Sequence, residues 1–149
     1  CDIVLLKGGL WSTPFNRKIY FMSQNVLSTK LKKILVIEDD ISIGEVIQLI
    51  LSQDDAYKSV VIDNPRKAVE TAKCMQPDLF IIDYHLSGID GIHLYDEMHR
   101  PSELQTIPAI ITTASLESHT QELEERGLVG LAKPFDMDDL LDTVKQAML

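Results

Sequence analysis

Cysteine is scarce in this sequence, which has two such residues, Cys1 and Cys74, among 149. Two cysteines are too few for the multi-disulfide framework that stabilises small secreted domains. No Cys or His ligand spacing recurs, so a structural zinc site is not expected either. This cysteine usage is typical of a reducing compartment, and we expect a cytoplasmic protein.

Long apolar runs are also missing, since none reaches the roughly 20 residues that a membrane-spanning helix needs. Basic residues are outnumbered: 14 Lys and Arg stand against 23 Asp and Glu, for a formal net charge of -9. No Lys/Arg cluster stands out, which argues against binding to nucleic acid. We therefore expect no membrane and no nucleic-acid partner, because an acidic surface suits a protein partner or a bound cation better.

The first residues differ in character from the rest of the chain. They contain a Gly8-Gly9 pair, Pro14 and the sole Trp, and they show no sustained periodicity. Met22 opens a stretch that would make a plausible native start. We predict an N-terminal extension over 1–29 and one globular domain over 30–149. Our hypothesis is that 1–21 form a non-native leader, and the alternative is a genuine extension.

From residue 32 onward, strand and helix signals alternate. Apolar runs at 33–37, 59–62, 79–82 and 109–112, with a weaker one near 129–131, predict five strands. Each strand is followed by apolar residues at helical spacing, which predicts a helix. The strands are mostly continuous apolar runs, as expected when both faces of a sheet are covered. Right-handed crossovers then give an α/β fold, a doubly wound parallel sheet with helices on both faces.

Polar side chains gather where the predicted strands end. In such sheets ligands bind beyond the carboxyl ends of the strands, so these ends should be considered together. The polar residues there are Glu38, Asp39, Asp40, Asp83, Thr113 and Lys133. Several carboxylates at one place repel each other, and a hard divalent cation relieves the repulsion. Mg²⁺ suits one or two carboxylates together with waters and phosphate oxygens. A carboxylate beside such a metal can attack phosphorus and form an acyl phosphate.

Each of these residues also has an ordinary structural interpretation. Asp40 fits a helix cap, and Asp83 alone could form a turn. Thr113 could satisfy a loop amide, and Lys133 could be a solvated lysine before a proline. Their joint occurrence at the ends of separate strands favours a shared site over coincidence.

Four motifs resemble those of response regulator receiver domains. They are the strand and acids at 34–40, the strand 79–83 followed by Asp90-Gly91, the stretch 108–114 and the Lys-Pro-Phe turn at 133–135. The resemblance runs from about residue 32 to the C-terminus, and it is specific because all four motifs occur in order. It implies a flavodoxin-like, five-stranded parallel sheet with strand order 2-1-3-4-5, similar to chemotaxis receivers.

The resemblance implies a phosphoacceptor signalling domain rather than a conventional enzyme. Asp83 would accept a phosphoryl group from a histidine kinase or histidine phosphotransfer protein. Thr113 would hydrogen-bond that group and Lys133 would pair with it. The domain would catalyse its own phosphotransfer and dephosphorylation. A downstream protein would read the face formed by helix 4, strand 5 and helix 5, which here span about 116–126, 129–131 and the stretch after 134.

The same resemblance implies a Mg²⁺ site. Its ligands would be the carboxylates of Glu38, Asp39 and Asp83, with the backbone carbonyl of His85 as a further ligand. The family often has an aromatic residue where this chain has Gly130, so coupling of Thr113 to an aromatic side chain is not expected here. It also often has a proline where this chain has Ser87, and we expect a looser loop at that position.

Two other functions compete with this interpretation. A phosphohydrolase with an aspartyl-phosphate intermediate would want a second Asp two residues after Asp83, where this chain has His85. A pseudo-receiver that is never phosphorylated is the nearer alternative, although the presence of Asp39, Thr113 and Lys133 argues against it. Homodimer formation, the cognate kinase and any further domain stay open.

Overall fold

The structure is a computed structural model that describes residues 30–149. The extension predicted over 1–29, including the proposed leader over 1–21, lies outside the described residues. The domain beginning near residue 30 is therefore described by itself.

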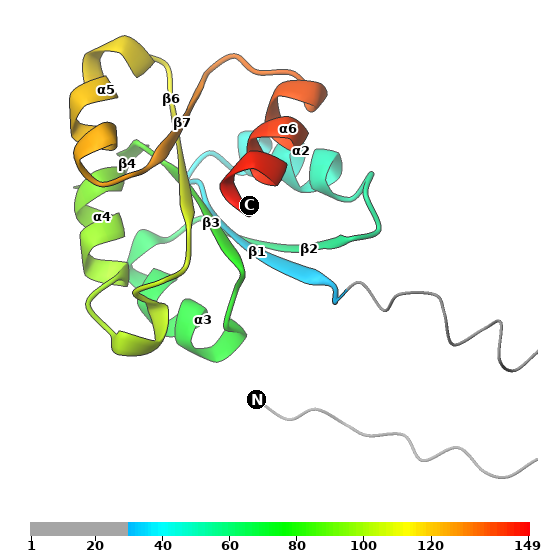
Figure 1. Ribbon diagram of the computed structural model, residues 1–149, viewed down its shortest axis with the longest axis horizontal. Helices are drawn as coiled ribbons and strands as arrows, with labels where there is room; N and C mark the ends of the chain where they lie inside the picture. Colours follow the sequence, from blue (N-terminus) through cyan, green and yellow to red (C-terminus); the bar gives the residue numbers. More distant parts are fainter. Residues whose placement is uncertain (1–29) are drawn as a thin grey trace, which may run out of the picture. The chain divides into compact units, whose positions relative to one another are not determined.

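Five parallel strands form the central sheet, in the spatial order β2-β1-β3-β6-β7 (Figure 1). Their bounds are β1 (Lys32–Ile37), β2 (Tyr57–Ile62), β3 (Leu79–Asp83), β6 (Ala109–Thr113) and β7 (Val129–Ala132). Every pairing in this sheet is parallel. The predicted fold class and strand order are confirmed, since β6 and β7 are the fourth and fifth strands of the sheet.

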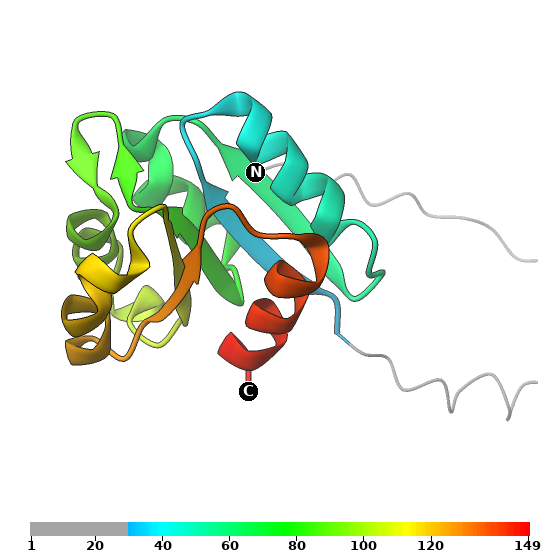
Figure 2. The same cartoon turned by 90° about the horizontal axis from the view of Figure 1, so that it is seen from above.

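Helices cover both faces of the sheet, as Figures 1 and 2 show. The helices α2 (Ile41–Leu51) and α6 (Met137–Ala147) pack on one face. The helices α3 (Ala68–Met75), α4 (Gly91–Met98) and α5 (Leu116–Glu125) pack on the other. Two single 3₁₀ turns, η1 (Pro65–Lys67) and η2 (Ser102–Leu104), complete this second layer. Each face therefore has its own apolar core, and the sheet separates the two cores.

Strand burial follows position in the sheet. All five residues of β3 and all five of β6 are buried, and β1 is buried over its last four residues. The edge strands β2 and β7 are only partly buried. Continuous apolar sequence thus marks the strands with helices on both faces, which explains why the signal for β7 is weak.

Local capping interactions set where several helices begin. The Asp40 carboxylate accepts hydrogen bonds from the amides of Ser42 and Ile43 and so caps α2. The side chain of Asn64 accepts from the Arg66 amide at the start of η1. The helix α6 begins with a reciprocal capping box between Asp136 and Asp139. The ordinary capping role of Asp40 is therefore confirmed.

A short antiparallel hairpin follows β3, where the sequence indicated only a loop. Its strands are β4 (His85–Leu86) and β5 (Ile89–Asp90), and Ser87 and Gly88 form the turn. Gly88 has a φ of 84°, a left-handed conformation that glycine adopts without strain. The hairpin ends directly at α4, so it carries the chain from the end of β3 back to the other face of the sheet.

Across residues 30–149, every helix is too short or too polar to cross a lipid bilayer.

Candidate functional site

Residues from the ends of β1, β3 and β7 meet at one edge of the sheet. Glu38 and Asp39 follow β1, and Asp83 is the last residue of β3. One carboxylate oxygen from each of these three acids lies within 4.8 Å of the others. The structure therefore brings together the acids that the sequence predicted to be neighbours.

Lys133, just after β7, reaches into this acidic cluster. Its Nζ lies 2.8 Å from Oε2 of Glu38 and 3.0 Å from Oδ1 of Asp83. Burial would lower the pKa of Lys133, but the hydrogen bonds to the two carboxylates outweigh burial and raise that pKa above the usual lysine value. The lysine is therefore a permanent cation at this site and neutralises part of its charge.

Glu38 is the most buried of the three acids, with 2% of its surface exposed, whereas Asp83 is 6% exposed. Burial raises the pKa of Glu38, and hydrogen bonds from Lys133 and the Asp40 amide offset this only in part. Burial therefore makes the ionised form of Glu38 more costly than that of a solvated carboxylate. Additional positive charge at this position would stabilise it.

Strand alternation places the side chains of Asp83 and Thr113 on opposite faces of the sheet. Asp83 follows the alternation of Leu79 and Ile81, which lie in the core under α2 and α6. Thr113 lies on the same face as Ala109 and Ile111, which are in the core under α4 and α5. Its Oγ1 is buried and accepts a hydrogen bond from the Ser115 amide at 3.1 Å. Thr113 therefore follows Thr112, the residue that pairs with Asp83 in the sheet register, and its hydroxyl is engaged by the Ser115 amide.

Thr112 lies beside Asp83 in the sheet register and is fully buried. Among residues 30–149, its Oγ1 is the one buried side-chain oxygen or nitrogen without a hydrogen-bond partner. A buried hydroxyl without a partner costs roughly 1–3 kcal/mol, and valine has nearly the same shape. We expect Thr112→Val to raise the free energy of unfolding by about 1 kcal/mol, measured by urea denaturation.

The matched control for this prediction is Thr143→Val, because the Thr143 hydroxyl donates to the Asp139 carbonyl at 2.6 Å. That variant should gain no stability. A Thr112→Val variant less stable than the parent protein would show that the hydroxyl has a partner in solution.

Gly91 allows α4 to begin against the end of β3. A Cβ at this position would lie 2.5 Å from the carbonyl oxygen of Asp83 and 2.9 Å from the Cα of Tyr84. The Gly91 amide donates to the Tyr84 carbonyl at 2.8 Å. The Asp-Gly pair noted in the sequence thus serves two purposes, since Asp90 caps α4 and Gly91 permits the close approach.

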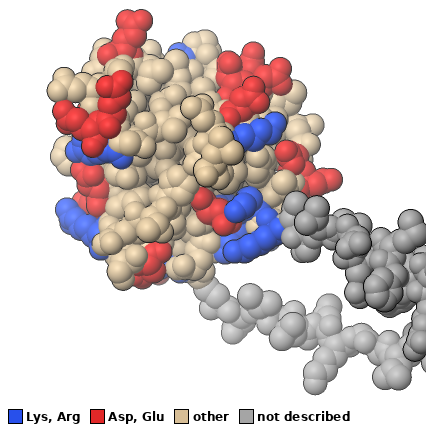
Figure 3. Space-filling model, in the orientation of Figure 1, with Lys and Arg blue, Asp and Glu red and all other residues tan. Residues whose placement is uncertain are grey.

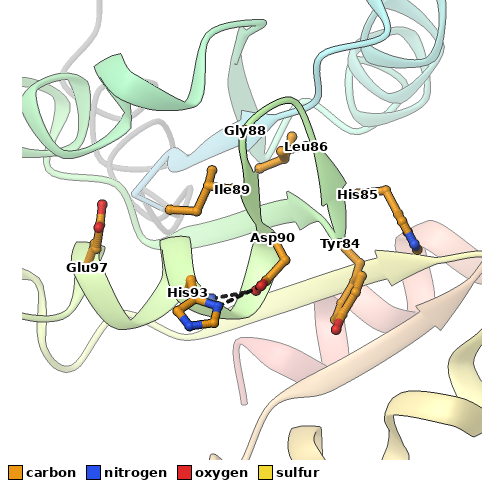
Figure 4. A pocket seen from close by; sticks show the side chains of 8 residues that line it. All are labelled: Tyr84, His85, Leu86, Gly88, Ile89, Asp90, His93 and Glu97. Carbon is orange, nitrogen blue, oxygen red and sulfur yellow. Dashed lines mark hydrogen bonds and ion pairs between the residues drawn. The ribbon is translucent and has the colours of Figure 1, made fainter.

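His85, the predicted carbonyl ligand, opens β4 two residues after Asp83, and its side chain is exposed. Figure 4 shows its ring and that of Tyr84 at one side of an open hollow around the hairpin, with Asp90 and His93 in contact at the start of α4. The Nδ1 of His93 lies 2.6 Å from Oδ2 of Asp90, and this hydrogen bond raises the pKa of His93. The His93–Asp90 contact lies at the start of α4, where Asp90 is the N-cap residue.

The hairpin turn makes a contact with the site that the sequence did not predict. The Ser87 amide and hydroxyl both donate to Oδ2 of Asp39, at 2.9 and 2.6 Å. The looser loop expected from a serine at this position is therefore not what the structure shows. A proline could make neither hydrogen bond, so replacing proline with serine adds a connection here.

Gly130 lies beneath α5, and leucine side chains occupy the space above it. A Cβ on Gly130 would lie 2.3 Å from Cδ1 of Leu116 and 2.9 Å from Cδ1 of Leu123. An aromatic side chain at position 130 would require both leucines to move. The ring contact to α5 instead comes from Tyr84, which stacks on His119 with ring centroids 3.7 Å apart.

The outer surface of α5 is acidic, and Figure 3 shows acidic side chains gathered over this helix. Glu117, Glu124 and Glu125 are exposed. Glu122 is paired with Arg126, which also forms a two-pronged contact with Asp96 of α4. Glu125 accepts a hydrogen bond from the side chain of Gln121. The surface therefore combines exposed acids with an ion pair that connects α5 to α4.

An apolar groove lies on the other side of the site, between α2 and the turn after β7. Its lining includes Val46, Lys133 and Phe135. Val46 in this lining is 52% exposed. Other large apolar side chains are exposed on α2 and at the start of α6: Ile41, Leu49 and Met137 are 63, 64 and 47% exposed. An exposed apolar surface of this kind is typical of a docking site for another protein.

Comparisons with known proteins identify the family of this chain. The model of the response regulator receiver domain matches residues 34–145. Sporulation initiation phosphotransferase F of Bacillus subtilis is 32% identical over 117 residues, which cover 77% of this chain and 92% of the relative. The chain spans only about half of other curated relatives, with 52% coverage.

Solved structures agree on the fold. A chemotaxis response regulator of Vibrio cholerae superposes with a TM-score of 0.71 at 27% identity, covering 79% of this chain and 99% of that protein. The receiver domain of a sensor histidine kinase from Pseudomonas aeruginosa, described with a magnesium ion coordinated in its active-site cleft, gives a TM-score of 0.69 at 24% identity, covering 78% of this chain and 97% of that domain. The extent of the family match and the identity to the Bacillus protein together place this chain in the response regulator receiver domain family.

Proposed function

We propose that this domain accepts a phosphoryl group on Asp83 from a phosphohistidine and so switches a protein-interaction surface. The observation that carries the proposal is the arrangement around Asp83. Its carboxylate lies near those of Glu38 and Asp39 and is hydrogen-bonded by Lys133. Membership of a two-component signalling family supports it.

The donor set at the site fits a magnesium ion. Three carboxylate oxygens within 4.8 Å of one another offer hard, anionic ligands, and the raised pKa of Glu38 indicates that the cluster needs positive charge. Glu38, Asp39, Asp83 and the carbonyl of His85 would hold the ion. When bound, Mg²⁺ neutralises charge on the phosphoryl oxygens. The Pseudomonas receiver, with magnesium in its cleft, supports the choice of metal.

Asp83 performs the chemical step in this proposal. One of its carboxylate oxygens attacks phosphorus, so that an oxygen–phosphorus bond forms while the bond from phosphorus to the donor nitrogen breaks. The electron pair of that bond stays on the donor imidazole. The Nζ of Lys133, already 3.0 Å from Oδ1 of Asp83, stays paired with the phosphoryl group and balances the negative charge that develops on the phosphoryl oxygens. Hydrolysis of the acyl phosphate later restores the carboxylate.

Thr113 would transmit the change to the opposite face of the sheet. Its hydroxyl accepts from the Ser115 amide, one residue before α5 begins. A phosphoryl dianion on Asp83 offers that hydroxyl a stronger acceptor. Moving Thr113 toward it would release the Ser115 amide and shift α5. A downstream protein would read the α5–β7–α6 face, through its different affinity for the two states.

The phosphodonor would dock on the apolar groove between α2 and the turn after β7. This groove includes Lys133 and therefore adjoins Asp83. A helical histidine kinase or phosphotransfer protein could cover Ile41, Val46 and Leu49 while presenting its phosphohistidine to the site. A cytoplasmic location, expected from the cysteine usage, completes the proposal.

The wild-type protein tests the proposal directly. We expect Mg²⁺-dependent incorporation of label from radioactive acetyl phosphate, lost in EDTA and mapped to Asp83 by mass spectrometry after borohydride reduction. Beryllofluoride with Mg²⁺ should change the amide spectrum of the α5 region. If neither incorporation of label nor a spectral change is observed, the domain is a pseudo-receiver instead.

A further inference from the structure

Asp39 is anchored by the hairpin turn and not by the strand that precedes it. Both the amide and the hydroxyl of Ser87 donate to a single oxygen, Oδ2, at 2.9 and 2.6 Å. The two residues are 48 positions apart in the sequence, so the contact joins the end of β1 to the turn between β4 and β5. Neither hydrogen bond uses Oδ1.

Asp39 is the acid in the cluster that most needs such an anchor. Glu38 and Asp83 are nearly buried and are both hydrogen-bonded by Lys133, whereas Asp39 is only partly buried. A partly exposed aspartate loses side-chain conformational freedom when it binds a metal, and that loss reduces affinity. Two hydrogen bonds to Oδ2 fix the carboxylate beforehand while Oδ1 stays available.

We propose that Ser87 is a positioning residue for the cation site, which orients Asp39 toward a divalent ion without contacting the ion itself. The inference rests on the proposed function, because it requires that the three acids hold Mg²⁺. Groups that hydrogen-bond a metal ligand from outside typically contribute 10–100-fold to metal affinity. Ser87 is exposed, so the lower end of this range applies and the expected contribution is about 10-fold.

The backbone conformation of the turn allows substitutions that remove one or both of the Ser87 hydrogen bonds. Among residues 30–149, Gln76 is the one non-glycine residue with a positive φ, so Ser87 has a negative φ, as proline requires. Ser87→Ala removes the hydroxyl and keeps the amide donor. Ser87→Pro removes both donors and suits the first central position of the turn. Ser87→Thr keeps both donors.

The experiment is a calorimetric titration of each variant with Mg²⁺ alone. We expect Ser87→Ala to raise the dissociation constant about 10-fold and Ser87→Pro to raise it further, while Ser87→Thr stays near wild type. Ser52→Ala is the matched control, since its hydroxyl donates to the Leu49 carbonyl at 2.7 Å, outside the cluster. Thermal unfolding in EDTA should show the Ala, Thr and control variants equally folded.

The outcomes separate the inference from the proposed function. If the wild-type protein binds no Mg²⁺, the proposed function fails. If the wild type binds and Ser87→Ala binds equally well, the positioning role fails while the proposed function stands. Tighter binding by Ser87→Ala would also overturn the inference, because it would mean that Ser87 competes with the ion for Asp39.

Discussion

Asp83→Asn is expected to incorporate no label from acetyl phosphate while it folds as stably as the parent protein. An amide oxygen is too weak a nucleophile to displace a phosphoryl leaving group, so the chemistry is lost. The fold is kept because asparagine has the shape of aspartate and its carbonyl can still accept the hydrogen bond from Lys133, now 3.0 Å from Oδ1. Removing one charge beside buried Glu38 also relieves repulsion in the metal-free protein.

Asp63→Asn is the matched control, because Asp63 is an exposed acid that directly follows β2 at the same edge of the sheet. This variant should take up label at the wild-type rate. Circular dichroism and urea denaturation of Asp83→Asn would check the fold. Wild-type levels of label on Asp83→Asn, mapped to another residue, would refute the assignment of Asp83.

Lys133→Met is expected to lose both stability and phosphoryl uptake. It leaves Glu38, 2% exposed, without the ammonium group that now lies 2.8 Å away. Breaking a buried ion pair by removing one partner typically costs 3–5 kcal/mol, and we expect about 3 kcal/mol here because Lys133 is partly exposed. The loss of a cation that contacts the transferring group should slow uptake by about 100-fold.

The stability loss should depend on pH. Glu38 already has a raised pKa, so its protonated form is favoured in the folded protein, and removing Lys133 raises that pKa further. A carboxyl group of this kind contributes stability below its unfolded pKa, and the contribution is lost as pH rises through the folded pKa. The cost of Lys133→Met is therefore largest at neutral pH and shrinks as the pH falls toward the unfolded pKa of glutamate.

Urea denaturation in EDTA at several pH values would measure this effect. Lys145→Met is the control, because Lys145 forms an exposed pair with Asp142 at 3.9 Å and such pairs are worth at most about 1 kcal/mol. Added Mg²⁺ should stabilise Lys133→Met more than the parent protein, since the ion supplies the missing charge. A cost no larger than that of Lys145→Met would show that solvent or a bound ion already screens Glu38.

The sequence allowed the fold and most of the site to be predicted because both depend on regular features. Buried parallel strands appear in the sequence as continuous apolar runs, and their carboxyl ends share one edge of the sheet. Glu38, Asp83 and Lys133 could therefore be grouped from the sequence alone. The capping role of Asp40 followed from local chemistry alone.

Other features could not be predicted from the sequence, because they depend on contacts between segments that are distant along the chain. The bond from Ser87 to Asp39 requires the exact path of a two-residue turn, and a serine in a loop carries no signal for it. The packing of Leu116 over Gly130 is likewise set by where α5 rests on the sheet. The missing partner of Thr112 became apparent only from its surroundings.

The division of the interior by the sheet has a consequence for how complexes of this domain assemble. The apolar groove on α2 and the acidic exterior of α5 belong to helices on opposite faces. A donor seated on the groove would leave the α5 exterior uncovered. Because the groove also includes the turn between β7 and α6, which belongs to the proposed readout face, a donor and a target would compete for that turn. Loading and readout are then expected to alternate, except for a target that contacts α5 alone.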